Sequence, residues 1–258
     1  MDAQRLRRDY DRATETLEAP LAITDLDAFD RNAAALVRRA AGKPIRIASK
    51  SVRCRTLLQR ALACDGFAGV MAYSLAEAIW LCRSGISEDI LLGYPSVDRA
   101  ALRELARDET ARAHITLMID SPEHLDLTDR LLGTGHPALR VCLELDASWR
   151  PIGGRDLLHV GSRRSPVFNP SQAGRLAEQV RDRAGFELVG VMAYEGQIAG
   201  LGDAPAGRPW RAAAVRFVQR RSIAELRGRR AAAVARVRSV AELEFVNGGG
   251  TGSVASTT

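Results

Sequence analysis

Lysine is almost absent from this 258-residue chain. Lys43 and Lys50 are the only lysines, and every other strongly basic side chain is an arginine. A chain that fills its basic positions with arginine has little use for lysine as general surface charge. Lysine differs from arginine because its amine can lose a proton when desolvated and can then add to a carbonyl carbon to form a Schiff base. The two lysines are therefore the first candidates for chemistry.

Long apolar segments and paired cysteines are also missing. No apolar run approaches the roughly 18 residues of a membrane span, and the amino-terminal MDAQRLRRDY lacks an apolar signal segment. The cysteines show neither a C-x-x-C pair nor the spacing of metal ligands. They are Cys54, Cys64, Cys82 and Cys142. We expect reduced, buried thiols in a cytoplasmic protein that does not enter a membrane.

The charge balance is basic, with a net charge of +6 and a pI of about 9.6. The arginines are spread along the chain, and the densest basic segment, residues 216–238, alternates them with alanine and valine at helical spacing. This segment lacks the set of aromatic side chains on which nucleic-acid bases stack. A solvated helix face is the favoured interpretation, and nucleic acid is only a minor alternative as a partner.

Short aliphatic segments alternate with helical patterns along the chain. The predicted strands are residues 20–26, 45–50, 69–73, 89–94, 114–120, 138–146, 188–195 and 243–247. Such strands, separated by helices, favour a parallel sheet with both faces covered. A dinucleotide-binding open sheet is disfavoured because no G-x-G-x-x-G follows the first strand. The pattern predicts an α/β fold of the (β/α)8 TIM-barrel type over residues 20–258, after a helical extension at residues 1–19.

In such a barrel the chemistry lies where the strands end. The side chains expected there are Lys50, Tyr73, Tyr94, Asp120, Asp146, Tyr194 and Asn247. Lys43, by contrast, stands in a Gly-Lys-Pro turn and has the context of solvated charge. Taken alone, Lys50 is explained more simply as a strand-end lysine that reaches water. A second segment of the chain changes that balance.

That segment is the glycine loop, residues 247–253, with the sequence NGGGTGS directly after the last predicted strand. Consecutive glycines discard side-chain packing and lose backbone entropy on folding. Close approach of the backbone to an anion explains them, because successive N–H groups can form a concave nest that binds phosphate. The alternative is a flexible terminal tail. The loop is not a Walker motif, since G-K-[ST] is absent.

An amine at one strand end and a phosphate loop at another are the two anchors of pyridoxal 5′-phosphate (PLP). The chain resembles the fold-type III PLP enzymes, the alanine-racemase-like barrels, and within them the amino acid deaminase/aldolase branch near D-threonine aldolase and D-serine dehydratase. The resemblance covers residues 20–253. The segments that carry it are PLAITDLDAFDRN, PIRIASKSVR, FAGVMAYSLAEA, ILLGYPSVD, VCLELDAS, GSRRSP, LVGVMAYEGQIAG and FVNGGGTGS.

The resemblance implies roles for individual residues. Lys50 would be the Schiff-base lysine, and Tyr194 would line the cofactor pocket. The phosphate would be bound by Asn247, Gly248, Gly249, Gly250, Thr251, Gly252 and Ser253. An arginine between residues 148 and 165 would approach the cofactor ring or the substrate carboxylate, with Arg150 and Arg163 as the leading candidates among the four that this segment contains.

The implied activity is that of a PLP-dependent lyase of the deaminase or aldolase type, acting on a small amino acid of probable D configuration. An amino-acid racemase of the same fold and a non-catalytic PLP carrier are the alternatives. Members of the group carry a second, β-rich domain that supplies metal ligands and dimer contacts, whereas this sequence stops soon after the glycine loop. We therefore expect a barrel that lacks its last strand and the C-terminal β domain. We expect no metal ligands in this chain, and a divalent metal only together with that domain. We also expect a homodimer at full length and weak activity of this chain alone.

Overall fold

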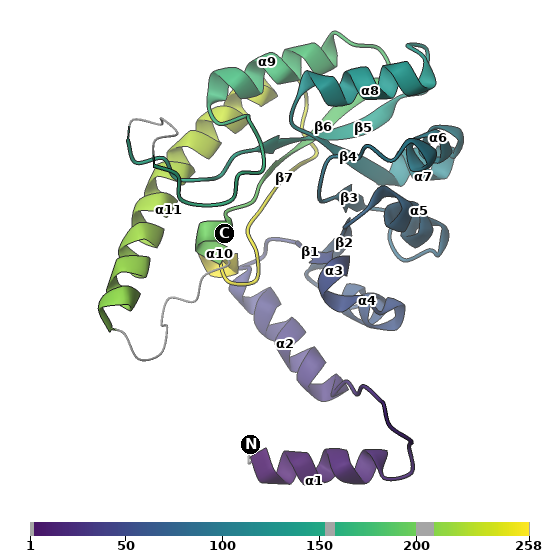
Figure 1. The fold of residues 1–258 in the computed structure, drawn as a ribbon, viewed down its shortest axis with the longest axis vertical. Coiled ribbons are helices and arrows are strands. Elements are labelled where there is room, and N and C mark those ends of the chain that lie inside the picture. The colour runs from purple at the N-terminus through teal and green to yellow at the C-terminus, as the bar shows by residue number, and fades with distance from the viewer. Residues whose placement is uncertain (1–2, 153–157, 200–208, 258) are drawn as a thin grey trace.

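The computed structural model describes residues 3–152, 158–199 and 209–257. Within them, seven parallel strands form one curled sheet in chain order (Figure 1). The strands are β1 Ile45–Ala48, β2 Phe67–Ala72, β3 Ile90–Leu92, β4 Ile115–Ile119, β5 Leu139–Leu145, β6 Phe186–Ala193 and β7 Phe245–Gly248. This topology confirms the predicted strand–helix barrel, in a form that is open between β1 and β7 because these two strands are its edges.

Helices cover the outer face of the sheet (Figure 1). The helices in the described residues are α1 Ala3–Thr14, α2 Leu26–Arg39, α3 Ser49–Val52, α4 Arg55–Leu62, α5 Leu75–Arg83, α6 Arg99–Arg107, α7 Glu109–His114, α8 Pro122–Leu132, α9 Pro170–Arg181, α10 Gly196–Ala199, α11 Pro209–Arg238 and α12 Val254–Thr257. Side chains close several helix starts, as at α5, where Ser74 accepts a hydrogen bond from the Glu77 amide. Helix α1 lies apart from the barrel, and none of its residues, all of which the structure describes, is buried.

The predicted first strand, residues 20–26, is wrong. Residues 21–25 have no regular secondary structure, and helix α2 begins at Leu26 with Asp25 as its N-cap. Leu21 and Ile23 are exposed there. An extended segment becomes a strand only when another strand pairs with it, and in the described part of the chain β1 pairs with β2 alone.

The interior of the barrel is packed by the inward-facing side chains of its central strands. Leu91, Met118, Cys142 and Met192 come from β3, β4, β5 and β6 and form one buried cluster. The outward-facing side chains of the same strands pack against the helices in a larger cluster. Because both faces are covered, these strands are mainly aliphatic and show no regular alternation with polar residues, although β5 carries the buried Glu144.

The open seam between β1 and β7 is bridged by one side chain. Arg46 of β1 donates a hydrogen bond to Asn247 Oδ1 of β7 at 3.2 Å, and its guanidinium carbon lies 4.2 Å from the centre of the Phe245 ring. The same guanidinium pairs with Asp89 at 2.7 Å. A β-carbon on Gly190 would lie 2.3 Å from the Phe245 ring, so glycine on β6 leaves the space that this ring fills.

The predictions about cysteines and about membrane spans can be compared with the structure. All four cysteines are free, as predicted, and Cys82 and Cys142 are buried. The expectation of burial is wrong for Cys54, which is exposed, and for Cys64, which is half-buried. Within the described ranges no helix combines the length and the apolar character needed to cross a membrane.

Candidate active site

Lys50 lies immediately beyond β1, in the first turn of α3, with its side chain at the exposed rim of the barrel. Its Nζ donates a hydrogen bond to the Tyr94 hydroxyl at 3.4 Å. Tyr94 follows β3 and is half-buried. Arg53 ends α3 in the left-handed conformation and donates from Nε to the carbonyl oxygen of Lys50 at 3.1 Å. The amine therefore points along the ends of the strands, toward β3.

Arg164 lies between two tyrosines of this rim. Its guanidinium carbon is 4.4 Å from the centre of the Tyr94 ring and 5.3 Å from that of Tyr194, which follows β6. Nε pairs with Glu144 Oε1 at 2.5 Å, and Nη2 donates to the carbonyl oxygen of Gly93 at 2.7 Å. Because the Glu144 side chain is only 1% exposed, the guanidinium is anchored from below by a buried carboxylate.

The glycine loop packs directly against α10 and Tyr194. A β-carbon on Gly252 would lie 2.3 Å from the backbone oxygen of Ala199, and one on Gly250 would lie 3.0 Å from the Ala199 β-carbon and 3.5 Å from the Tyr194 ring. Ser253 is buried, and its hydroxyl accepts from the Gly250 amide at 3.1 Å. Gly252 needs to be glycine because the Ala199 backbone occupies the space of a β-carbon, and at Gly250 a β-carbon would be tight against the Ala199 side chain.

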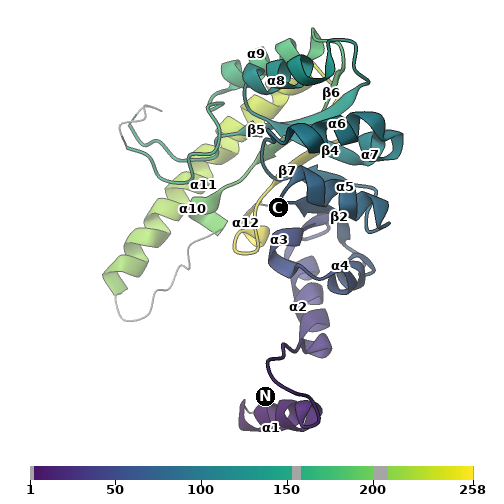
Figure 2. The ribbon, with the colours of Figure 1, turned by 45° about the vertical axis from the view of Figure 1, so that its right-hand side comes forward.

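Helix α3, which contains Lys50, and helix α12, which follows the glycine loop, lie at the same end of the sheet (Figure 2). Contacts join the Lys50 amine to Tyr94, Tyr94 to Arg164 and Arg164 to Tyr194, and a β-carbon added at Gly250 of the loop would lie 3.5 Å from the Tyr194 ring. The amine comes from one edge strand and the loop from the other. The structure thus places an amine, two phenol rings, a guanidinium and a glycine loop at one rim of the sheet.

Arg150 contacts partners other than the two tyrosines. Arg150 pairs with Asp146 at 2.5 Å and stacks on Phe168, with its guanidinium carbon 4.1 Å from the ring centre. Arg163 is exposed on the segment before Arg164. Asn247, the first residue of the predicted loop, is turned into the seam toward Arg46.

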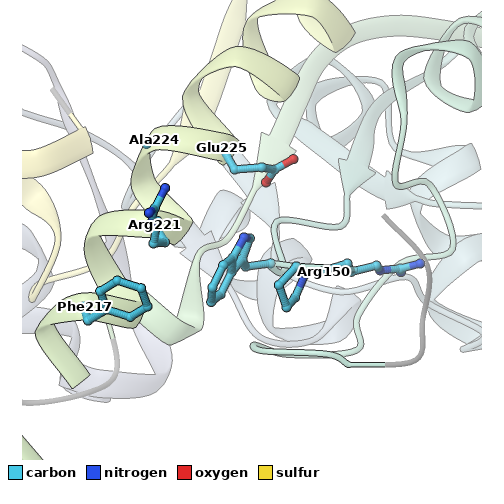
Figure 3. A pocket seen from close by; sticks show the side chains of 7 residues that line it. Arg150, Phe217, Arg221, Ala224 and Glu225 are labelled. Atoms are coloured by element: carbon cyan, nitrogen blue, oxygen red, sulfur yellow. The ribbon is translucent and has the colours of Figure 1, made fainter. Parts of the chain in front are cut away.

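A pocket of about 470 Å³ lies beside Arg150, between the segment after β5 and helix α11. Figure 3 shows Phe217, Arg221 and Glu225 on α11, with the Arg150 guanidinium directed away from them. Neither Lys50 nor the glycine loop lines this pocket. It is therefore separate from the rim that carries the predicted anchors.

Two buried carboxylates near the strand ends have altered acidity. Burial raises the pKa of Glu144 above its ordinary value, and the adjacent Arg164 guanidinium opposes that shift. Burial likewise raises the pKa of Asp120, which follows β4, and the nearby His124 acts in the opposite direction. Among the residues that the structure describes, no group of three or more His, Cys, Asp or Glu side chains is arranged to hold a metal ion.

Sequence reasoning placed Tyr94 at the rim but gave it no role, and it ranked Arg164 behind Arg150 and Arg163. The available signal for Arg164 was Glu144, an acidic residue within the otherwise aliphatic β5 segment VCLEL. A buried carboxylate requires a partner, and the irregular segment that follows supplies arginines. The spacing along the chain does not reveal which of those arginines folds back onto it.

A profile of the alanine racemase N-terminal domain matches residues 24–241. The chain belongs to this family. This family consists of fold-type III enzymes that use pyridoxal 5′-phosphate. No curated protein matches the chain in sequence.

Solved structures of several enzymes share the fold. D-threonine aldolase from Filomicrobium marinum is 23% identical with a TM-score of 0.68, over 93% of this chain and 59% of that enzyme. D-threo-3-hydroxyaspartate dehydratase from Delftia sp. HT23 is 21% identical with a TM-score of 0.59, over 91% and 61%. Alanine racemase from E. faecalis is 16% identical with a TM-score of 0.53, over 89% and 53%. The chain thus spans between half and two thirds of the length of these structures.

The residues at this rim of the sheet fit the cofactor of the family. PLP presents an aldehyde, a flat ring and a phosphate, and it therefore needs an amine, a surface for the ring and an anion-binding backbone. Here the Lys50 amine is exposed at the rim, the half-buried Tyr194 ring packs against the inner cluster, and the loop backbone at Gly252 lies where a β-carbon has no room.

Proposed function

We propose that this chain is the cofactor-binding barrel of a PLP-dependent lyase, of the deaminase or aldolase type, that acts on a small D-amino acid through Lys50. One observation carries the proposal: contacts link the Lys50 amine, just beyond one edge strand, to Tyr94, Arg164 and Tyr194, and Tyr194 lies beside the glycine loop that follows the other edge strand. PLP bound between them supplies an electron-withdrawing ring that weakens the bonds to the α-carbon of a linked amino acid.

Each residue of this rim then has a task. Lys50 would hold the cofactor through its aldehyde and, when free, would move a proton at the substrate α-carbon. Tyr194 provides a wall for the ring, and the amides of the loop bind the phosphate. We assign to Arg164, rather than to Arg150 or Arg163, the arginine role at the ring or the substrate carboxylate, because the Arg164 guanidinium contacts both tyrosine rings.

The lyase assignment is supported by the relatives. By their names, D-threonine aldolase and D-threo-3-hydroxyaspartate dehydratase act on hydroxylated D-amino acids, and each is over 20% identical to this chain. A racemase that forms the same α-carbanion is the second candidate, supported by the alanine racemases among the neighbours. A lyase breaks either the bond between the α- and β-carbons or the bond between the β-carbon and its substituent. A racemase only exchanges the α-proton.

Covalent attachment of PLP tests the first step. The 258-residue chain is mixed with PLP, reduced with borohydride and digested, and the modified peptide is identified by mass. We expect the modification on Lys50 and its loss in Lys50→Ala. Lys43→Ala is the matched control and retains it, since Lys43 lies in an exposed turn before β1. Absence of modification in the unaltered chain, or modification of Lys43 alone, contradicts the proposal.

Turnover separates the candidate functions. D-serine and D-threonine are supplied to the PLP-loaded protein, and the released keto acid, aldehyde and glycine are measured beside the L enantiomers. Release from the D enantiomers supports the lyase, and interconversion of enantiomers without release supports the racemase. Stable attachment with neither outcome supports a carrier, or a barrel that requires further protein for turnover.

A further inference from the structure

The Lys50 amine has a specific neighbour in Tyr94. Nζ donates to the Tyr94 hydroxyl at 3.4 Å and lies 5.7 Å from the centre of its ring. The Lys50 side chain is exposed and extends from a helix of only four residues. A lysine with many accessible rotamers points in one direction only when an acceptor holds it. The hydroxyl of Tyr94 is such an acceptor.

Tyr94 is itself held on several sides. The Arg164 guanidinium carbon lies 4.4 Å from its ring centre and is fixed by Glu144 and by the carbonyl of Gly93, the residue just before Tyr94. The ring of Tyr73 meets it edge-on, with 5.5 Å between centres. The Tyr94 ring is thus supported by Arg164, which in turn pairs with Glu144 of the buried strand β5. Reactive groups supported in this way keep a fixed geometry.

We propose that Tyr94 is a further residue of the reaction centre, whose hydroxyl aims the Lys50 amine at the carbonyl carbon that it attacks. Arg164 is a positioning residue, because it acts on the amine through the Tyr94 ring. Correct orientation of a nucleophile lowers the barrier because it removes the entropy of finding that geometry. The role in attack rests on the proposed function, whereas the contact between Tyr94 and Lys50 can be tested without the cofactor.

The scarcity of lysine makes the cofactor-free test clean. Reductive methylation with ¹³C-formaldehyde labels Lys43, Lys50 and the amino terminus, and each gives its own NMR signal. Tyr94→Phe keeps the ring and removes only the hydroxyl, so we expect the Lys50 signal to move and the Lys43 signal to stay. Tyr10→Phe is the matched control, because it removes the same atom from a tyrosine that bonds to Asp25 before α2. It should leave the Lys50 signal in place.

The second test measures the rate at which Lys50 takes up PLP, by borohydride trapping at short times. Tyr94→Phe should slow attachment about fivefold, the factor expected from one lost hydrogen bond. Arg164→Met should slow it in the same direction. Arg164→Lys should recover only part of the rate, because an ammonium lacks the planar fork that reaches both Glu144 and Gly93. Tyr10→Phe should react at the unaltered rate.

A change in the circular dichroism of the bound cofactor should accompany the slower attachment, because that signal reports orientation and a purely structural role would not alter it. If Tyr94→Phe leaves the Lys50 signal and the attachment rate unchanged while Lys50 still takes up PLP, the role of Tyr94 is overturned and the proposed function stands. If Lys50 never takes up PLP in the unaltered chain, both fall.

Discussion

The middle of the sheet and its two edges are built differently. All five residues of β4 are buried, as are all but one of β5, whereas β1 has one buried residue and β7 has none. The central strands are held by packing against both faces. The edges meet through a polar contact, the hydrogen bond from Arg46 to Asn247. The candidate chemistry belongs to the edges, since Lys50 follows β1 and the glycine loop follows β7.

This difference separates stability from chemistry. Apolar burial stabilises the centre without regard to direction. A reactive amine and an anion-binding backbone must instead remain open to small molecules, and their geometry then depends on a few directional contacts, such as those of Tyr94 and Arg164. Substitutions should accordingly affect unfolding most at the centre and cofactor handling most at the edges.

The largest effect on stability is expected for Leu143→Ala in β5. Leu143 is fully buried, and a leucine-to-alanine change in a core typically destabilises by about 2–5 kcal/mol. Val246→Ala in β7 is the matched edge variant, where 41% of the side chain is exposed and removing it leaves less of a cavity. Urea unfolding measures both. Equal losses at the two positions would contradict the contrast between centre and edge.

Gly252→Ala should come next and should also weaken PLP retention. Its β-carbon would lie 2.3 Å from the Ala199 backbone oxygen, so the loop or α10 must shift, and overpacking of this kind typically destabilises by about 1–3 kcal/mol. Gly228→Ala in α11 is the control, because nothing lies within 4 Å of the added carbon and alanine favours the helix. Unfolding curves and PLP titration are compared. A Gly252→Ala protein with unchanged PLP affinity argues against the loop as the phosphate site.

Arg46→Met tests the seam. Methionine retains apolar contact with Phe245 and removes the bonds to Asn247 and Asp89, and hydrogen bonds to charged groups typically contribute about 1.5–3 kcal/mol. The expected loss is near or below the lower end of that range, because Asp89 is 49% exposed and regains water. Hydrogen exchange should accelerate in β7 and remain slow in β5. Acceleration throughout the sheet would instead show that the seam and the centre unfold together.

The smallest effect concerns pH. Burial raises the pKa of Glu144 above its ordinary value of 4.5, so near that pH the native state holds a proton that the unfolded state has lost. Stability therefore falls as the pH rises from 4.5 through the native pKa, and lower pH restores it. Glu144→Gln cannot ionise and should lose this part of the slope. Unfolding free energies of Glu144→Gln and of the unaltered chain, measured from pH 4 upward, test this prediction. An identical dependence on pH in both proteins would contradict a raised pKa of Glu144.

Sequence patterns were sufficient for the repeating elements. Aliphatic runs separated by helices predicted all seven strands of the observed sheet, because a strand buried on both faces must be aliphatic. The same reasoning failed for residues 20–26, which have a strand-like composition and no strand beside them in the described structure. Amino-acid composition indicates the tendency of a segment to adopt an extended conformation, whereas strand formation also requires a neighbouring strand with which the segment can pair.

By itself, the sequence determined the order of strands and helices, the unusual Lys50 and the glycine loop, since each is a local property of a few adjacent residues. Only the tertiary structure decided which distant residues meet: Tyr94 at the Lys50 amine, Arg164 between two tyrosines, and Arg46 across the seam. The physical reason is that curling of the sheet brings the ends of different strands together. Contacts between those ends depend on side-chain direction and burial in three dimensions, which spacing along one chain does not encode.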